Sequence, residues 1–202
     1  MTALRPRPAR RAGLLILALC GIVLAACSHG SLRTREAGAP ASQADVREFF
    51  PLEVGATWRY TVNRLGKKAT WTRSISAREG DDFVFSDFVR VRATALGVRD
   101  QDRYFLRNGI AAGESWWAQL AVDRRLQVEV KATDASVTTL AGRFDGCLVV
   151  QESQPLPDQH TLVTQITYAR GVGMVKRVIL VRKPGGGSMS QESAELMSYT
   201  HP

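Results

Sequence analysis

Residues 57–63, TWRYTVN, alternate large apolar side chains with polar ones, and this pattern decides the fold class. Successive side chains of a β-strand point to opposite faces, so a period of two places Trp58, Tyr60 and Val62 together on one face. The polar residues between them then point to the other face. Such alternation is typical of antiparallel strands that have one face on a core and one in water.

The same period of two recurs along the chain after residue 45, whereas no stretch has a convincing helical period of 3.6. "ADVREFF" (44–50) is compatible with one helical turn, and "QESAELMSY" (191–199) fits either a helix or a final strand. Nine or ten short strands are expected in total. Further strand-like runs are VRVRA (89–93), LQVEVKA (126–132), ATWTRSIS (69–76), DFVFSD (82–87), RYFLR (103–107), CLVVQES (147–153), TLVTQITYAR (161–170) and MVKRVILVRK (174–183).

Turn signals separate these runs. Asn108-Gly109 is the strongest hairpin signal, because both residues tolerate positive φ. Gly171 and Gly173 on either side of Val172 predict a tight turn with unusual φ values. Residues 45–202 therefore predict one all-β domain, a curved antiparallel meander that is half-barrel or barrel-like. A sandwich stays possible, but a curved sheet protects its edges better.

The first 26 residues have the features of a secretory signal peptide. Residues 1–13 carry four arginines and no acidic residue, and residues 14–26 form an uncharged, almost wholly apolar run. A helix needs about 20 apolar residues to span a bilayer, so this run is too short for a comfortable membrane span. A positive flank, a short apolar core and small residues before a cut are typical of export signals.

The sequence LAAC (24–27) resembles the lipobox of bacterial lipoproteins. In that family the cysteine receives a diacylglycerol, the chain is cut just before it, and the new amine is acylated, commonly with palmitate. The resemblance implies a lipid-anchored Cys27. Ser28 after the cysteine, by the sorting rules of enteric bacteria, implies the outer membrane, with the domain facing the periplasm. An ordinary signal peptide with a coincidental cysteine is the alternative.

Residues 27–44 predict a lipidated cysteine followed by a flexible tether. The segment contains no aromatic residue and a single large aliphatic one, Leu32, so it cannot bury enough apolar surface to fold. Residues 1–26 hold four of the 27 Lys and Arg residues and none of the 19 Asp and Glu residues. The net charge therefore drops from +8 for the whole chain to +4 without them. This small net positive charge does not indicate nucleic-acid binding.

Cysteine usage predicts a domain without an internal disulfide. Cys20 would leave with the signal peptide and Cys27 would be lipidated, so Cys147 is the only thiol left in the mature chain. It lies in the apolar run GCLVV (146–150), where a small buried hydrophobic role is expected. The fold would then depend on its core alone.

Four further segments follow a pattern found in known proteins: FFPLEVGATWRYTV (49–62), AGESWW (112–117), LAGRFDGCLVV (140–150) and YARGVGMVKR (168–177). Together they resemble a family of uncharacterised bacterial lipoproteins. That family opens with Phe-Pro-Leu-x-x-Gly-x-x-Trp-x-Tyr and carries a Gly-Val-Gly-x-Val-Lys signature. The resemblance supports a β-rich envelope domain, and the family has no settled activity. A second tryptophan at 117 and a late PGGGS (184–188) depart from its pattern.

Residues suited to catalysis or metal binding are sparse. The three histidines, His29, His160 and His201, have no ligand-like neighbours at metal spacing, so neither a metal nor a cofactor is expected. His160 has no nucleophile-elbow sequence beside it. The acids lie mostly at turns, where Asp is favoured for local hydrogen bonding. We therefore expect a protein that is not an enzyme.

Aromatic residues carry the remaining functional signal. Trp116 and Trp117 are adjacent, so in a strand their side chains point to opposite faces and one of them is expected to be exposed or to line a cavity. A cavity lined by tryptophan and tyrosine would suit a lipid or an acyl chain. The leading hypothesis is an envelope lipoprotein that binds an apolar ligand or an envelope partner. The alternative is a scaffold or assembly subunit of an outer-membrane complex. Candidate ligand-binding residues are Trp58, Tyr60, Trp71, Trp116 and Trp117.

Overall fold

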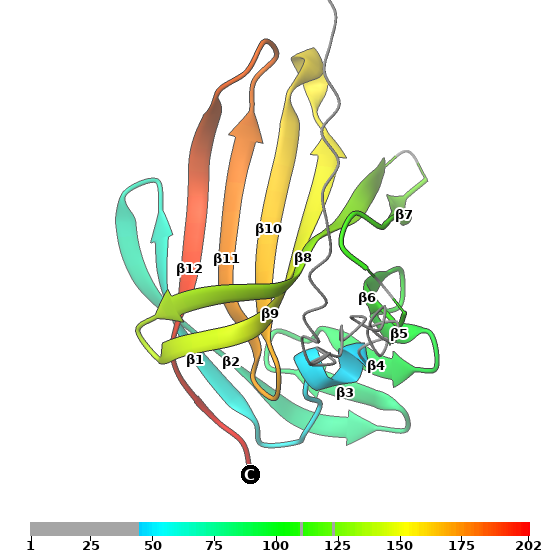
Figure 1. The fold of residues 1–202 in the computed structure, drawn as a ribbon. Coiled ribbons are helices and arrows are strands. Elements are labelled where there is room, and N and C mark those ends of the chain that lie inside the picture. The colour runs from blue at the N-terminus through cyan, green and yellow to red at the C-terminus, as the bar shows by residue number, and fades with distance from the viewer. Residues whose placement is uncertain (1–44, 110, 123) are drawn as a thin grey trace, which may run out of the picture. The chain divides into compact units, whose positions relative to one another are not determined.

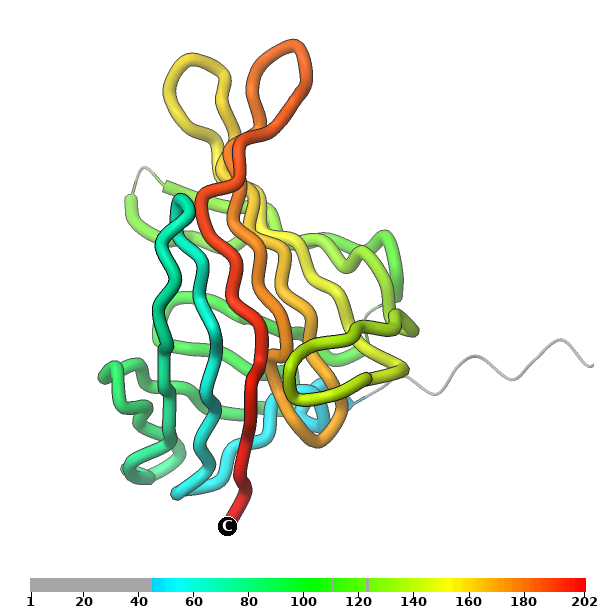
Figure 2. Tube along the Cα trace, turned by 90° about the vertical axis from the view of Figure 1, so that its left-hand side faces the viewer, coloured from blue at the N-terminus to red at the C-terminus, as the bar shows by residue number. Residues whose placement is uncertain are grey.

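A computed structural model describes residues 45–202 except 110 and 123. The predicted signal peptide, Cys27 and the tether lie outside the described residues. The described chain forms one 12-stranded sheet in which every ladder is antiparallel (Figures 1 and 2). The strands are β1 (Thr57–Arg64), β2 (Lys67–Glu79), β3 (Asp82–Phe85), β4 (Arg90–Thr94), β5 (Gly97–Arg99), β6 (Tyr104–Arg107), β7 (Ser115–Ala121), β8 (Arg124–Thr139), β9 (Gly142–Pro155), β10 (Thr161–Ala169), β11 (Gly173–Arg182) and β12 (Ser188–Thr200).

The strand order is β6-β5-β4-β3-β2-β1-β12-β11-β10-β9-β8-β7. The prediction of an all-β, curved antiparallel sheet is confirmed, although the sheet has more strands than the nine or ten expected. Two meanders of six strands each meet where β1 pairs with β12, from Thr57↔Thr200 to Arg64↔Glu192. The first and last strands therefore lie in the middle of the sheet, and the consecutive strands β6 and β7 form its two edges.

The two edges approach each other through side chains. Trp116 on β7 donates from Nε1 to the carbonyl oxygen of Tyr104 on β6, at 3.3 Å. The Arg107 guanidinium lies 5.9 Å from the centre of the Trp116 ring. No backbone ladder joins β6 to β7 among the described residues, so this line is a seam that only side chains cross.

A short 3-10 helix, η1 (Val46–Phe49), packs against the sheet before β1. The prediction of a helical turn here is confirmed. The side chain of Asp45 caps the helix by accepting from the backbone N–H of Arg47, and Val46 and Phe49 are buried. The next residue, Phe50, stacks on Phe105 with ring centres 6.0 Å apart. This apolar segment therefore packs into the interior of the curved sheet.

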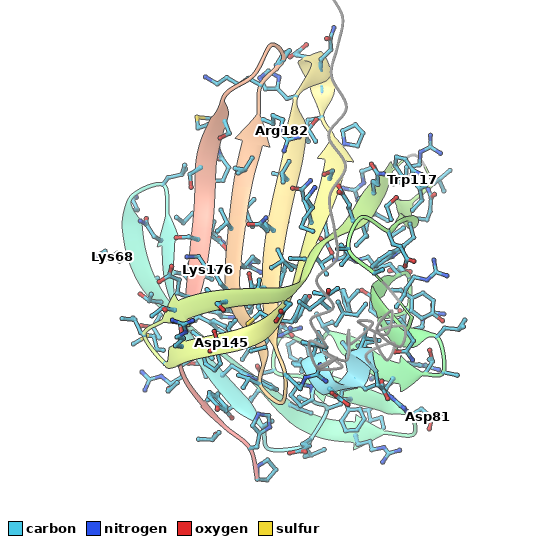
Figure 3. The ribbon with its side chains drawn as sticks, viewed as in Figure 1. Lys68, Asp81, Trp117, Asp145, Lys176 and Arg182 are labelled. Atoms are coloured by element: carbon cyan, nitrogen blue, oxygen red, sulfur yellow. The ribbon has the colours of Figure 1, made fainter. Side chains whose placement is uncertain are left out.

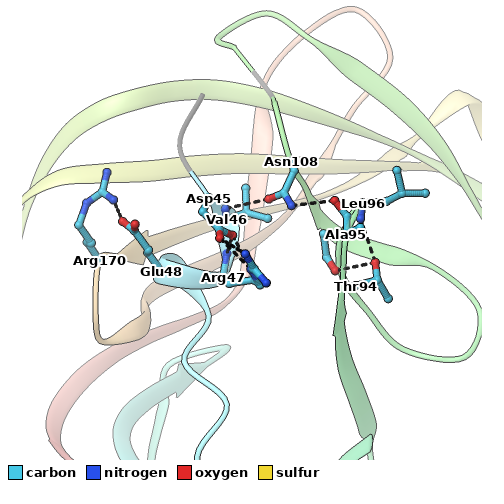
Figure 4. Close-up of polar contacts among 10 residues, drawn as sticks. Asp45, Val46, Arg47, Glu48, Thr94, Ala95, Leu96, Asn108 and Arg170 are labelled. Atoms are coloured by element: carbon cyan, nitrogen blue, oxygen red, sulfur yellow. Dashed lines mark hydrogen bonds and ion pairs between the residues drawn. The ribbon is translucent and has the colours of Figure 1, made fainter. Parts of the chain in front are cut away.

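The expected hairpin at Asn108-Gly109 is wrong. Gly109 does adopt positive φ, but the strands on either side, β6 and β7, do not pair. The Asn108 side chain is used for long-range bonds, since its Oδ1 accepts from the N–H of Val46 in η1 and its Nδ2 donates to Ala95 (Figure 4). Asn108 thus fastens η1 to the turn between β4 and β5.

The β8–β9 hairpin is long and bent. The β8–β9 register shifts between Val130 and Ala132, between Ala132 and Ala135, and between Ala135 and Val137. Such bulges bend a strand and increase its local twist. The far half of the hairpin crosses β12, where the N–H of Ala141 donates to Leu196 at 3.0 Å (Figure 1).

The core follows the predicted alternation. Trp58, Tyr60 and Val62 of β1 are all buried, and so are Leu126, Val128 and Val130 of β8. The ambiguous segment 191–199 is strand, not helix, and belongs to β12.

Two further predictions, one about a turn and one about Cys147, are confirmed. Gly171 and Gly173 have φ of 70° and 96°, as expected for the tight turn between β10 and β11. Cys147 is fully buried, and burial raises the pKa of its thiol. This thiol is therefore a packing group.

Candidate functional site

Strand register brings charged side chains to the interior face. Residues paired across an antiparallel ladder point to the same face of the sheet. Trp71 on β2 pairs with buried Tyr60, and the two rings stack with centres 5.1 Å apart. Arg177 on β11 pairs with buried Ala194 of β12. Trp71 and Arg177 therefore face the interior, although they lie 106 positions apart in the chain.

Two neighbouring hollows open on this face. The first, here called the aromatic hollow, has a volume of ≈ 520 Å³. The second, here called the arginine hollow, has a volume of ≈ 270 Å³. Trp71 and Arg177 line both, so the hollows adjoin. The aromatic hollow is lined by Val62, Arg64, Lys67, Ala69, Trp71, Arg177 and Glu192, and the arginine hollow chiefly by Phe50, Trp71, Arg73, Asp100, Arg103, Phe105, Tyr168 and Arg177.

Glu192 holds two arginines at the wall of the aromatic hollow. Its carboxylate accepts from Arg64 Nε at 2.7 Å and from Arg177 at 2.5 Å, and its side chain is almost fully buried. Burial alone would raise the pKa of Glu192, but the hydrogen bonds from Arg64 and Arg177 outweigh it and lower that pKa. Glu192 is therefore a stable anion in the folded protein.

Glu152 on β9 is a second buried glutamate, and its pKa is shifted in the opposite direction to that of Glu192. Arg103 donates to it at 2.7 Å, and both side chains are largely buried. Burial raises the pKa of Glu152, and the opposing effect of Arg103 does not cancel the rise. The pKa values of Glu192 and Glu152 are thus shifted in opposite directions: Glu192 has two arginine donors, whereas the pKa of Glu152 is raised by its burial and by the nearby charge of Asp100, and Glu152 has one arginine donor.

Arg73 is the least satisfied cation of the interior. Its side chain is only 19% exposed, and its Nε lies 3.1 Å from a carboxylate oxygen of Asp87. This contact lacks the alignment of a hydrogen bond, so the buried Nε has no hydrogen-bond partner among the described residues. The guanidinium lies 4.0 Å from the centre of the Phe85 ring and 6.0 Å from that of Trp71. Aromatic faces attract a cation but cannot accept its N–H groups as an oxygen would.

The structure separates the five predicted aromatic site residues. Trp58 and Tyr60 are buried, and each donates to a backbone carbonyl, Val172 at 2.6 Å and Met174 at 3.0 Å. The space they help to line measures only ≈ 30 Å³. Trp71 alone of the five lines the two larger hollows.

The adjacent pair on β7 behaves as the alternation predicts. Trp116 is buried at the seam, whereas Trp117 points outward and is 58% exposed (Figure 3). The Arg125 guanidinium lies 4.9 Å from the centre of the Trp117 ring. Neither Trp116 nor Trp117 lines the two hollows that contain Trp71.

Sequence reasoning missed the charged residues of the interior. Arg73, Arg177 and Glu192 each sit at an inward position of a strand, where an apolar residue is the usual occupant. The signal available in the sequence was the spacing of two along a strand. Arg73 lies two positions before buried Ile75 in β2, and Glu192 lies two positions before buried Ala194 in β12, so each shares the inward face.

The described part of the chain contains no group of three or more His, Cys, Asp or Glu side chains placed to hold a metal ion. Within the same residues, no helix is both long enough and apolar enough to span a bilayer. The interior instead combines aromatic surface with guanidinium groups. Chemically, this combination can bind an apolar body and an acceptor group at once.

Comparison with known proteins gives few relatives. No protein-family model matches the sequence, and no curated protein matches it. Among solved structures, the chain is similar to a protein of Parabacteroides distasonis proposed to be a lipoprotein. The identity is 14%, the match covers 75% of this chain and 98% of that one, and the TM-score is 0.42. It is also similar to a protein of Bacteroides fragilis proposed to be exported, with a YmcC-like fold. There the identity is 14%, the coverage is 76% and 99%, and the TM-score is 0.46.

Proposed function

We propose that this chain is a non-catalytic lipoprotein of the bacterial envelope that binds an apolar chain, such as that of a lipid, inside its curved sheet. Residues 1–26 direct export, Cys27 carries the acyl groups, and the domain faces the periplasm from the outer membrane. Three features of the first 27 residues support the anchor: the cationic residues 1–13, the apolar run 14–26 and the LAAC sequence at 24–27.

The aromatic hollow is the observation that carries the binding proposal. Its volume of ≈ 520 Å³ lies within the range of small-molecule sites, about 300–1,000 Å³. Val62, Ala69 and the Trp71 ring give it apolar walls, while Arg64 and Lys67 supply charged groups. Burying a methylene of a ligand against such walls contributes about 0.8 kcal/mol.

A substitution that fills the hollow tests the proposal. Ala69 lines the hollow, whereas its neighbour Thr70 points to the opposite face of β2. The full-length protein, extracted gently from its native membrane, is examined by native mass spectrometry for a co-purifying hydrophobic molecule. We expect one with the wild type and with Thr70→Trp, and none with Ala69→Trp. Absence of such a molecule from every form, together with no binding of added fatty acid, would contradict the proposal.

The anchor has its own test. Intact mass of the protein from the membrane fraction should match a chain that begins at residue 27 and carries acyl groups on Cys27. Cys27→Ser should move the protein to the soluble fraction. A mature chain with an unmodified thiol at position 27 would remove the proposed location.

A scaffold role is the second candidate, and the edge strand β7 favours it. Trp117 is 58% exposed, and Val122 after the same strand is fully exposed. Large apolar side chains beside a free strand edge are typical of protein contacts. A photo-crosslinker at position 117 should then trap one envelope protein in cells. A crosslinker at exposed Arg59, on β1, serves as the control.

A further inference from the structure

The arginine hollow contains hydrogen-bond donors that its own acids do not satisfy. The Nε atoms of Arg73 and Arg177 are both buried, and neither has a hydrogen-bond partner among the described residues. A buried donor without an acceptor costs about 1–3 kcal/mol, and more when it is charged. Two such donors in the lining of one hollow are unusual, because most buried polar groups are paired.

The nearby carboxylates leave the Nε atoms of Arg73 and Arg177 without a hydrogen bond. Glu192 accepts from Arg64 and Arg177, and Glu152 accepts from Arg103. Asp100, which lines the arginine hollow, accepts from the backbone N–H groups of Asp102 and Arg103. Asp87 approaches Arg73 without the alignment of a hydrogen bond. The acceptor that would complete Arg73 is therefore missing from the surrounding carboxylates.

The two arginines are placed around a shared aromatic residue. The Arg177 guanidinium lies 5.1 Å from the centre of the Trp71 ring, and that of Arg73 lies 6.0 Å from it. Both guanidiniums also line the arginine hollow, which adjoins the aromatic hollow at Trp71. Guanidinium groups favour carboxylate and phosphate oxygens, which can accept two N–H groups at once.

We propose that the arginine hollow binds the anionic head group of an amphiphile, a carboxylate or a phosphate, with Arg73 and Arg177 as its donors and the apolar chain in the aromatic hollow. The inference rests on the proposed function, because it assigns a head group to the same apolar ligand. The ligand then lies with its charge toward Arg73 and its chain beside Val62 and Ala69.

Calorimetric titration of the full-length protein with matched ligands tests this assignment. Dodecanoate and dodecyl phosphate carry the charge, uncharged dodecanol lacks it, and acetate and inorganic phosphate lack the chain. We expect at least one charged amphiphile to bind about tenfold or more tightly than dodecanol, in line with the strength of a charge-assisted hydrogen bond. The stronger of the two charged ligands identifies the head group. Free acetate and phosphate should bind far more weakly than either.

Substitutions test whether Arg73 and Arg177 produce the preference for a charged ligand over dodecanol. Arg73→Met and Arg177→Met should each reduce the preference for the charged ligand over dodecanol by about tenfold, whereas Arg73→Lys should retain part of it. Exposed Arg59→Met, on the outer face of β1, is the control and should behave as the wild type. If Arg177→Met fails to fold, because Glu192 loses a donor, the Arg73 variants suffice.

The outcomes separate the two proposals. Equal binding of dodecanol and both charged amphiphiles overturns the head-group assignment and leaves the apolar site standing. Binding of free phosphate or acetate as tightly as the amphiphiles also overturns it, since the hollow would then be a plain anion site. Failure of all the amphiphiles to bind removes the proposed function and this inference together.

Discussion

The surroundings of Trp58 and those of Trp71 differ in how much open space they contain: the hollow beside Trp58 measures only ≈ 30 Å³, whereas the two hollows that Trp71 lines measure ≈ 520 and ≈ 270 Å³. Trp58 is buried, and its Nε1 donates to Val172 at 2.6 Å. Around Trp71, two arginines each keep a buried Nε without a partner among the described residues. The two tryptophans lie on neighbouring strands, so the contrast develops over a short distance within one sheet.

This contrast separates the structural part of the interior from the part available to a ligand. A filled region, such as that around Trp58, has no room for a guest molecule. A region with buried donors and no acceptor gains a hydrogen bond when a suitable guest enters. Stability and ligand binding should therefore respond differently to substitutions in the two regions.

Trp58→Ala should have the largest effect on stability. The substitution leaves a cavity in a filled region and removes the donor to Val172, so we expect a loss of about 3–5 kcal/mol in the free energy of unfolding. Urea denaturation followed by circular dichroism measures it. A loss below about 1 kcal/mol would show that this region is not the rigid part of the interior.

Glu192→Gln should have the next largest effect, and it should depend on pH. At pH 7 the substitution weakens two charge-assisted hydrogen bonds, and we expect a loss of about 2 kcal/mol. The lowered pKa of Glu192 means that its stabilisation is present above the usual Glu pKa of about 4.3 and is lost as the pH falls through the folded value. Denaturation curves at pH 7 and in acid should therefore show the gap between wild type and variant closing.

Glu195→Gln is the matched control on the outer face of the same strand. Glu195 pairs with Lys176 at 2.8 Å, and both side chains are about one-third exposed. A pair of this kind contributes less than about 1 kcal/mol. An equal loss for both glutamate variants would contradict the special position of Glu192.

Arg73→Met should change the free energy of unfolding by less than about 1 kcal/mol. Either no change or a small gain in stability agrees with this expectation. The reason is that methionine removes an incompletely paired, mostly buried cation while keeping an apolar stem. Arg103→Met should cost more, because it leaves buried Glu152 without its donor. Thermal unfolding of the two variants side by side gives the comparison, and an equally large loss for Arg73→Met would show that Arg73 is already satisfied.

Trp117→Ala should have the smallest effect, within about 0.5 kcal/mol, because the ring is 58% exposed and contacts mainly Arg125. The same urea experiment serves as the measurement. A loss comparable to that of Trp58→Ala would place Trp117 in a packed region of the sheet.

The fold class could be predicted from the sequence because alternation in single strands is a local property. TWRYTVN and LQVEVKA indicated the buried faces of β1 and β8 correctly. The strand order was not accessible in the same way, since the β1–β12 ladder joins residues as far apart as Arg64 and Glu192. Asn108 was misjudged because its hydrogen bonds to Val46 and Ala95 depend on distant parts of the chain.

The candidate site was only partly predictable. Aromatic content drew attention to Trp71, which lines both hollows, but it gave the same weight to Trp58, which is buried in the core. Arg73 and Arg177 went unnoticed because a charged residue in an alternating strand is normally assigned to the water-facing side. Their inward positions follow from pairing with particular neighbours, and that pairing is visible only in three dimensions.

The β1–β12 ladder also has a consequence for the order of folding. β12 follows all other strands along the chain, so β1 gains its second partner only when the last strand of the sheet joins the fold. Until then β1 and β11 each expose an unpaired edge, and the two meanders can form separately but cannot join. Completion of the sheet is therefore a late, long-range closure step, of the kind that slows the folding of β-proteins.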